Sequence, residues 1–138
     1  MVPPLARACY SERIMEKSFV ILGSVFMFLG VGAGAFGAHG LAPYFARYPE
    51  LESVYETAVR YHVYHGLALL AAAWVAEKWP GALAHWAGYL FVAGILIFAG
   101  SLYLLVFTRL RWLGAITPLG GAAFLAGWLC LALAAWRG

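Results

Sequence analysis

Charged residues divide the chain into long apolar stretches. Three stretches contain no Asp, Glu, Lys or Arg and cover 18–46, 79–108 and 112–136. Each is long enough to cross a bilayer, because a spanning helix needs about 20 apolar residues at a rise of about 1.5 Å per residue. A fourth stretch, 61–76, is slightly short, but a helical pattern of apolar positions over 50–59 leads directly into it. The pattern therefore predicts one long helix there that starts at the membrane surface.

We predict an all-α protein, an integral membrane four-helix bundle. The expected helices cover about 17–38, 58–77, 82–107 and 114–136, with an interfacial helical extension over about 50–57. Helices satisfy their own backbone polar groups, which lipid cannot do. The breaks between them contain Pro43, Pro49, the turn Trp79-Pro80-Gly81, and Arg109 with Arg111. Residues 15–138 are thus expected to form a single transmembrane domain.

The first 14 residues differ in character from the rest. They contain two prolines and the charged residues Arg7, Glu12 and Arg13. We expect residues 1–14 to form a flexible tail, and Met15 is a second candidate for the start of the protein. An alternative takes 19–36 as the apolar region of a signal peptide, but its length and its glycines favour a membrane helix.

Composition supports a membrane protein and excludes several classes of function. Hydrophobic residues make up 64% of the chain and charged residues 11%, against about 45–50% and about 25% in soluble domains. The chain contains no Asp, Asn or Gln, which excludes Asp-based triads and EF-hand loops. Its two cysteines form no CxxC motif, so zinc or redox spacing is absent. The basic residues are scattered at segment ends, so we expect contact with the lipid bilayer and none with nucleic acid.

Orientation follows weakly from the basic residues. Four spans place both termini on one side of the membrane. That side carries five basic residues and the other carries four. Lys17 flanks the first predicted helix, so we expect the termini to be cytoplasmic.

Small residues recur along one side of three predicted helices. Helix association in lipid depends on close backbone approach, which glycine permits. The positions we assign to helix packing are Gly30, Gly34, Gly94, Gly100, Gly120, Gly121 and Gly127. They serve either contacts within the bundle or contacts with another subunit, so a homo-oligomer or a membrane-protein partner is expected. Pro118 removes a backbone donor and should bend or delay the last helix after Thr117.

A polar cluster is the strongest candidate site in the sequence. His39 ends the first predicted helix, while Arg60, His62 and His65 lie at the entry of the second. If these two helices are antiparallel neighbours, all four residues lie on the same membrane side. Glu56 is a nearby acid, and Thr117 precedes the break in the last helix. Ionisable residues at membrane depth are functional candidates.

Several interpretations of this cluster stay open. It can cap and hydrogen-bond the helix ends, or bind a quinone, a lipid headgroup or another small ligand. Histidines on two helices are also the minimum for haem ligation, and a metal would need further ligands such as Glu56. A proton path through histidine is a further alternative. We assign no catalytic residue, no metal and no cofactor, because Ser101 has no Asp to orient a histidine and no glycine pattern forms a nucleotide loop.

Four motifs in order resemble the signature of the YgdD family of small membrane proteins. They are GAFGAHGL at 34–41, TAVRYHVYHGLAL at 57–69, GILIFAGSLY at 94–103, and ITPLGG at 116–121 followed by Gly127-Trp128. The resemblance covers about Met15 to the end. It implies four membrane helices, a bacterial inner-membrane location and no known activity. One departure is Ala99, where the family often has Ser, which removes a hydroxyl beside Ser101 and weakens a polar-pathway interpretation.

The sequence therefore leads to two main functional hypotheses. The first is a non-enzymatic accessory or scaffold unit, because small-residue stripes occur without a catalytic set. The second is the binding or conduction of a small ligand, quinone, lipid or ion through the His/Arg cluster. An enzyme acting on a lipid or quinone is a weaker third.

Overall fold

The protein is built entirely from helices and short turns over the part of the chain that the structure describes. The computed structural model describes the backbone of residues 4–138 and the side chains of residues 14–138. Its helical elements are α1 (Pro4–His39), α2 (Ala42–Arg47), α3 (Pro49–Lys78), α4 (Ala82–Gly94), the π-helical segment η1 (Ile95–Ala99), α5 (Gly100–Thr108), the 3₁₀ segment η2 (Arg111–Ala115) and α6 (Thr117–Arg137). The all-α prediction is confirmed.

Helix α1 starts earlier than the sequence pattern indicates. It begins at Pro4, where proline suits the first turn, and no glycine or proline interrupts it before Gly23. Residues 1–3 of the expected tail lie outside the described residues, and 4–14 continue the helix. The flexibility of 1–14 stays a prediction.

Helix α3 is continuous from Pro49 to Lys78, so the expected stretches 50–57 and 58–77 form one helix. Proline occupies its first turn, and the acidic side chains of Glu50 and Glu52 lie there as well. Both features favour a helix start, because proline has no N–H to lose and carboxylates interact well with the positive end of the helix dipole. Lys78 complements the opposite end.

Helices α4 and α5 form one rod with a π-helical turn between them. The five residues Ile95–Ala99 adopt the wider π geometry, and Gly94 and Gly100 flank them on either side. This turn was not predicted from the sequence. A π-helical turn holds one more residue than an α-helical turn, and that extra residue does not alter the apolar composition from which the helix was predicted. Such turns often occur at functional sites.

The last helix begins late, as Pro118 indicated. A 3₁₀ segment precedes it, and α6 then starts at Thr117 with proline in its first turn.

The α4–α5 rod ends at Arg109, whose φ of 60° places it in the left-handed region. Its guanidinium donates to the Tyr48 hydroxyl at 3.0 Å and lies over the same ring, which ties the loop to the end of α2.

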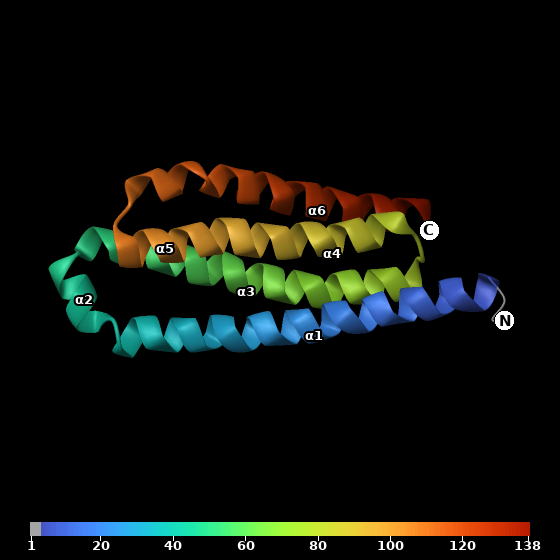
Figure 1. Ribbon diagram of the computed structural model, residues 1–138, viewed down its shortest axis with the longest axis horizontal. Helices are drawn as coiled ribbons and strands as arrows, with labels where there is room; N and C mark the ends of the chain where they lie inside the picture. Colours follow the sequence, from blue (N-terminus) through green and yellow to red (C-terminus); the bar gives the residue numbers. More distant parts are fainter. Residues whose placement is uncertain (1–3) are drawn as a thin grey trace.

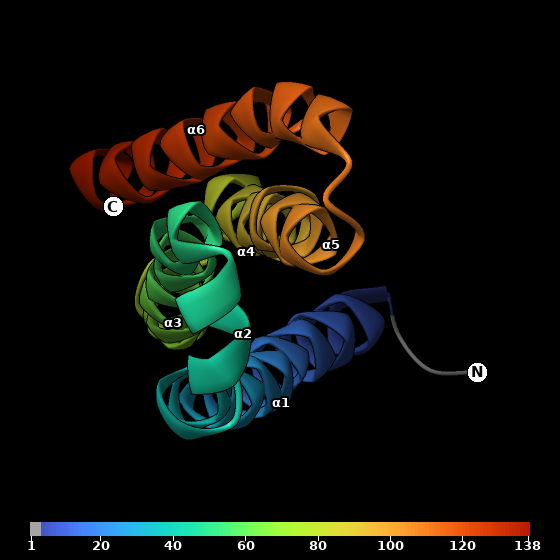
Figure 2. The ribbon, with the colours of Figure 1, turned by 90° about the vertical axis from the view of Figure 1, so that its left-hand side faces the viewer.

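The four long rods are arranged in an open series rather than a closed square. Helix α1 packs along α3, α3 packs along α4, η1 and α5, and α6 packs on α4 and η1 (Figure 1). Viewed along the rods, α1 and α6 lie on opposite sides of the molecule (Figure 2). The start of α1 does reach α4, where Phe19 lies edge-on to Tyr89 at 5.5 Å between ring centres. The beginning of α1 and the end of α6 lie at the same end of the molecule (Figure 1).

Among the described residues, three stretches are long and apolar enough to cross a membrane: Ile14–His39, Ala82–Thr108 and Arg111–Arg137. Helix α3 is not among them, although four spans were expected. Its tyrosines and histidines at 61–65 lower its mean hydropathy. The least apolar long helix therefore lies between the others, with α1 on one side and α4–α5 on the other.

The main core lies where α3, α4 and α6 meet. Phe91 and Leu69 are fully buried there, and Phe19 reaches the same cluster from α1. Small residues such as Ala72 and Ala87 fill the rest and keep the backbones close. This is the packing expected where dispersion contacts, not the hydrophobic effect, hold helices together.

Candidate functional site

The predicted polar cluster does not form one site. His39 is exposed, and its Nδ1–H donates to the Ala35 carbonyl of its own helix at 3.1 Å. His62 and His65 are buried, at 7% and 4% exposure, and contact different elements. The three histidines therefore do not converge. Among the described residues, no group of three His, Cys, Asp or Glu side chains is placed to hold a metal ion.

His62 is directed between α1 and α5. Its Nδ1 lies 3.3 Å from the Tyr103 hydroxyl, and its ring is edge-on to Phe26 at 5.5 Å. Its Nε2 is buried and has no hydrogen-bond partner within the described part of the chain, as is also true of Nε2 of His85. A buried nitrogen without a hydrogen-bond partner costs free energy, so these two imidazoles reduce the stability of the interior.

His65 is directed toward α6 and is fully hydrogen-bonded. Its Nδ1–H donates to the Tyr61 carbonyl at 2.8 Å, which leaves Nε2 as an acceptor for the Trp128 indole N–H at 3.2 Å. The imidazole also stacks on Phe124, with ring centres 3.4 Å apart and planes 9° from parallel. The bonds define a neutral tautomer, so His65 joins α3 to α6 as a structural contact.

Thr117 pairs with a residue that the sequence analysis had not placed in the site. Its hydroxyl lies 3.0 Å from that of buried Ser101, and Ser101 also donates to the Phe98 carbonyl at 3.0 Å. Phe98 belongs to the π-helical segment, where backbone carbonyls lose their regular partners. The pair therefore joins the start of α6 to η1.

Three partner residues were not assigned to the site: Tyr103, Trp128 and Ser101. One signal was available for Trp128, because it lies in the middle of an apolar stretch whereas the other tryptophans lie near helix ends. An indole N–H in an apolar environment needs an acceptor. Tyr103 and Ser101 gave no comparable signal, because their partners depend on how the helices are rotated.

Glu56 and Arg60 line a groove between α1, α2 and α3. The groove has a volume of about 330 Å³. Its lining is Gly34, Gly37, Ala38, Phe45, Glu52, Tyr55, Glu56, Val59 and Arg60. Tyr55 is buried beside the groove, and its hydroxyl donates to the Ala33 carbonyl at 2.7 Å. Burial raises the pKa of the Tyr55 phenol, so this hydroxyl stays protonated and keeps α1 and α3 joined.

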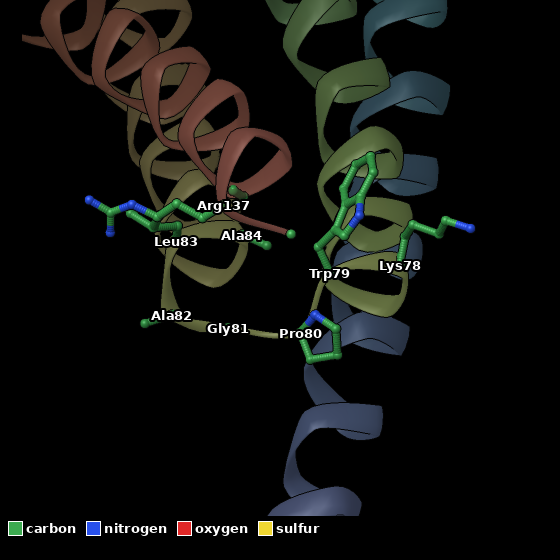
Figure 3. Close-up of a pocket in the computed structure, with 10 residues that line it drawn as sticks. Lys78, Trp79, Pro80, Gly81, Ala82, Leu83, Ala84 and Arg137 are labelled. Atoms are coloured by element: carbon green, nitrogen blue, oxygen red, sulfur yellow. The ribbon is translucent and has the colours of Figure 1, made fainter.

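Two further cavities lie beside α6. One of about 500 Å³ lies at the turn between α3 and α4, near the end of α6 (Figure 3). Lys78 and Arg137 extend their side chains away from it on opposite sides, so they do not converge on an anion (Figure 3). The other, of about 520 Å³, lies between α3 and α6 beside Tyr61 and Trp128. The Trp128 and His65 ring nitrogens there already bond each other.

Most of the assigned glycines lie at close contacts within the molecule. A Cβ at Gly30 would approach Val63 to 2.8 Å, and one at Gly34 would meet Val59 at 3.4 Å, so this GxxxG pair packs on α3. On the other side of the bundle, Gly94 and Gly127 accommodate the rings of Phe124 and Phe91, and Gly120 and Gly121 face Phe98. Gly100 differs, because a Cβ there would meet nothing within 4 Å.

Comparison with known proteins identifies relatives but no activity. Residues 33–121 match a family described as "Protein of unknown function (DUF423)". The chain is 47% identical to the UPF0382 membrane protein YwdK of Bacillus subtilis over 121 residues, which cover 86% of this chain and 96% of that protein. It is 45% identical to the UPF0382 membrane protein SH2409 of Staphylococcus haemolyticus, over 88% and 97% of the two chains. No solved structure matches. The expectation of a membrane protein from a family of unknown function is confirmed.

Proposed function

Because this chain belongs to the DUF423 family of membrane proteins, whose activity is unknown, we propose that it is a non-enzymatic accessory or scaffold unit that crosses the membrane four times and assembles through its outer helices. The partner is a second copy of the chain or another membrane protein. The motifs at 34–41 and 57–69 support its kinship with the YgdD family, and with it a bacterial inner-membrane location.

The open arrangement of the helices carries this proposal. Only 17% of the residues in the most apolar stretch of α1 are buried, against 39% for the α4–α5 rod. Helix α1 contacts mainly α3, which leaves one broad side of it uncovered. Gly32 lies on that side, where a Cβ would meet nothing within 4 Å. A glycine that no neighbour uses permits close approach of a helix from another subunit.

The separation of the polar groups supports a non-enzymatic role. His39 and His65 each bond a backbone carbonyl of their own helix, and His62 pairs with the phenol of Tyr103. Among the residues whose side chains the structure describes, no histidine hydrogen-bonds a serine, threonine or cysteine. General acid–base or nucleophilic chemistry requires such groups within hydrogen-bond reach of one another. The hydroxyls of Ser101 and Thr117 bond each other and a backbone carbonyl.

The position of α3 supports its inclusion as a fourth span. Its charge-free part, 61–76, rises about 24 Å, close to the roughly 30 Å hydrocarbon thickness of a bilayer. Arg60 and Glu77 flank it, and long side chains at such positions extend to the interface. The histidines that lower its hydropathy are buried against neighbouring helices. Four spans place both termini on one side, and Lys17 favours the cytoplasm.

We expect native mass spectrometry from a mild detergent to detect an oligomer or a stable partner complex. Gly32→Leu should lower the association constant of the oligomer by about tenfold, equivalent to about 1.4 kcal/mol, because the added side chain blocks close helix approach. Gly32→Ala is the matched control and should retain the oligomer. Wild-type protein that is monomeric, and that crosslinks to no partner in membranes, would contradict the proposal.

One observation favours the second hypothesis, ligand binding. The groove beside Glu56 and Arg60 brings side chains of both charges together in one cavity. It involves two of the six polar residues assigned from the sequence and none of the histidines.

A further inference from the structure

The groove between α1 and α3 presents its charges in a fixed order. Glu52, Glu56 and Arg60 follow at intervals of four residues along α3, so they lie on one stripe of the helix. Four residues rise about 6 Å, and Arg60 therefore lies about 12 Å further along α3 than Glu52. Because α3 runs from the α2 end into the bundle (Figure 1), Arg60 is the deepest of the three and the two carboxylates lie nearer the surface.

The three charges are free to act on an external group. All three side chains are exposed. Among residues 14–138, no basic side chain forms an ion pair with Glu52 or Glu56, and no carboxylate pairs with Arg60. The groove thus offers acceptors at its outer end and a guanidinium at its inner end, without an internal pair that must first be broken.

From this arrangement we infer that the groove binds the headgroup of phosphatidylethanolamine. In this lipid the phosphate is attached next to the glycerol, deeper than the terminal ammonium. A guanidinium below two carboxylates matches that order, with Arg60 donating to the phosphate and Glu52 and Glu56 accepting from the ammonium. The inference goes beyond the proposed scaffold role and depends on α3 entering the membrane.

The surroundings of the groove fit the rest of such a lipid. Its volume of about 330 Å³ lies at the lower end of the roughly 300–1,000 Å³ of small-molecule sites. Gly34 and Gly37 make room on the α1 side, because neither carries a side chain over Tyr55 and Val59. Deeper on the same stripe of α3, Tyr64 and Leu67 are about half exposed and provide an apolar path for acyl chains.

The same charges select against other common headgroups. The glycerol headgroup of phosphatidylglycerol carries no cation, so its phosphate would engage Arg60 but the carboxylates of Glu52 and Glu56 would be left without a cationic partner. The quaternary ammonium of phosphatidylcholine has no N–H to donate, whereas a primary ammonium donates three hydrogen bonds. Selectivity, rather than lipid binding as such, therefore distinguishes this site from the general lipid contacts of a membrane protein.

The test is competitive lipid retention in native mass spectrometry. Protein in mild detergent is equilibrated with equal amounts of phosphatidylethanolamine, phosphatidylcholine and phosphatidylglycerol. We expect the phosphatidylethanolamine adduct to exceed each of the others by about tenfold, and Glu56→Gln to abolish most of that preference. Glu50→Gln is the matched control, because it makes the same change on the same helix but outside the groove. Equal retention of all three lipids would overturn the inference.

A charge inversion tests the order itself. The double variant Glu56→Arg, Arg60→Glu keeps the net charge, and it should lose the preference for phosphatidylethanolamine; unchanged preference would overturn the inference. Soluble phosphoethanolamine should compete poorly, and competition equal to that of the lipid would refute a membrane lipid as the ligand. Labelling of introduced cysteines reports separately whether α3 crosses the membrane. Failure of the four-span topology can therefore be distinguished from failure of the lipid site.

Discussion

Gly120→Ala is expected to destabilise the protein by about 1–3 kcal/mol, the usual cost of forcing extra volume into a packed interface. A Cβ at Gly120 would lie 2.5 Å from the backbone nitrogen of Phe98. A flexible side chain could move aside, but backbone in the π-helical segment cannot do so without displacing α6 from the α4–α5 rod. The free energy of unfolding, measured in detergent micelles, checks this value.

The adjacent glycine provides the control. A Cβ at Gly121 would meet the Phe98 ring at 3.8 Å, which is ordinary van der Waals distance. Alanine is favoured over glycine inside a helix by roughly 0.5–1 kcal/mol. Gly121→Ala should therefore leave stability unchanged or raise it slightly. Equal destabilisation by the two substitutions would show that α6 does not approach η1 as described.

The second large effect is expected at the bond between α3 and α6. Trp128→Phe removes the donor to Nε2 of His65 and leaves that nitrogen buried without a partner, which costs about 1–3 kcal/mol. His65→Phe removes the acceptor instead, and the double variant replaces both by apolar rings. Because the double variant leaves no unpaired acceptor, it should be more stable than the sum of the single effects indicates.

A double-mutant cycle measures this coupling. Hydrogen bonds between membrane helices average about 0.6 kcal/mol and reach about 1.7 kcal/mol, so the coupling energy should fall in that interval. Trp136→Phe, at a tryptophan that is 88% exposed, is the control for the smaller ring. Strictly additive single effects would show that the two side chains do not bond.

Much of the helical layout could be predicted, because charges and helix-breaking residues mark it directly. Pro80 and Gly81 lie in the turn between α3 and α4, and α6 begins at Thr117 as its proline indicated. The early start of α1 could not be predicted from apolar pattern, because residues 4–13 are helical without being apolar. The π-helical turn was also missed, since helix type there depends on how Phe98 and Gly120 pack.

The candidate site was harder to predict than the fold. The sequence places His62 and His65 about 60° apart on one helix, which suggests a shared environment. In the structure one ring contacts Tyr103 and the other contacts Phe124, because α3 has neighbours on several sides. Spacing along a helix determines relative direction but not which neighbour lies in that direction. Only Glu56 and Arg60, four residues apart on an exposed stripe, line a common cavity.

The central position of α3 has a consequence for how the protein is made. Membrane insertion machinery selects each segment by its own hydropathy as it leaves the ribosome. On the proposed four-span topology, α3 is the segment least able to insert alone, and its polar face is covered only once α1 and α4–α5 lie beside it. Biogenesis would then proceed by joint insertion of α3 with its neighbours. A substitution at Gly30 that disrupts the α1–α3 contact would then first yield chains in which α3 fails to insert. Quality-control proteases would degrade these chains before any loss of stability of the folded protein takes effect.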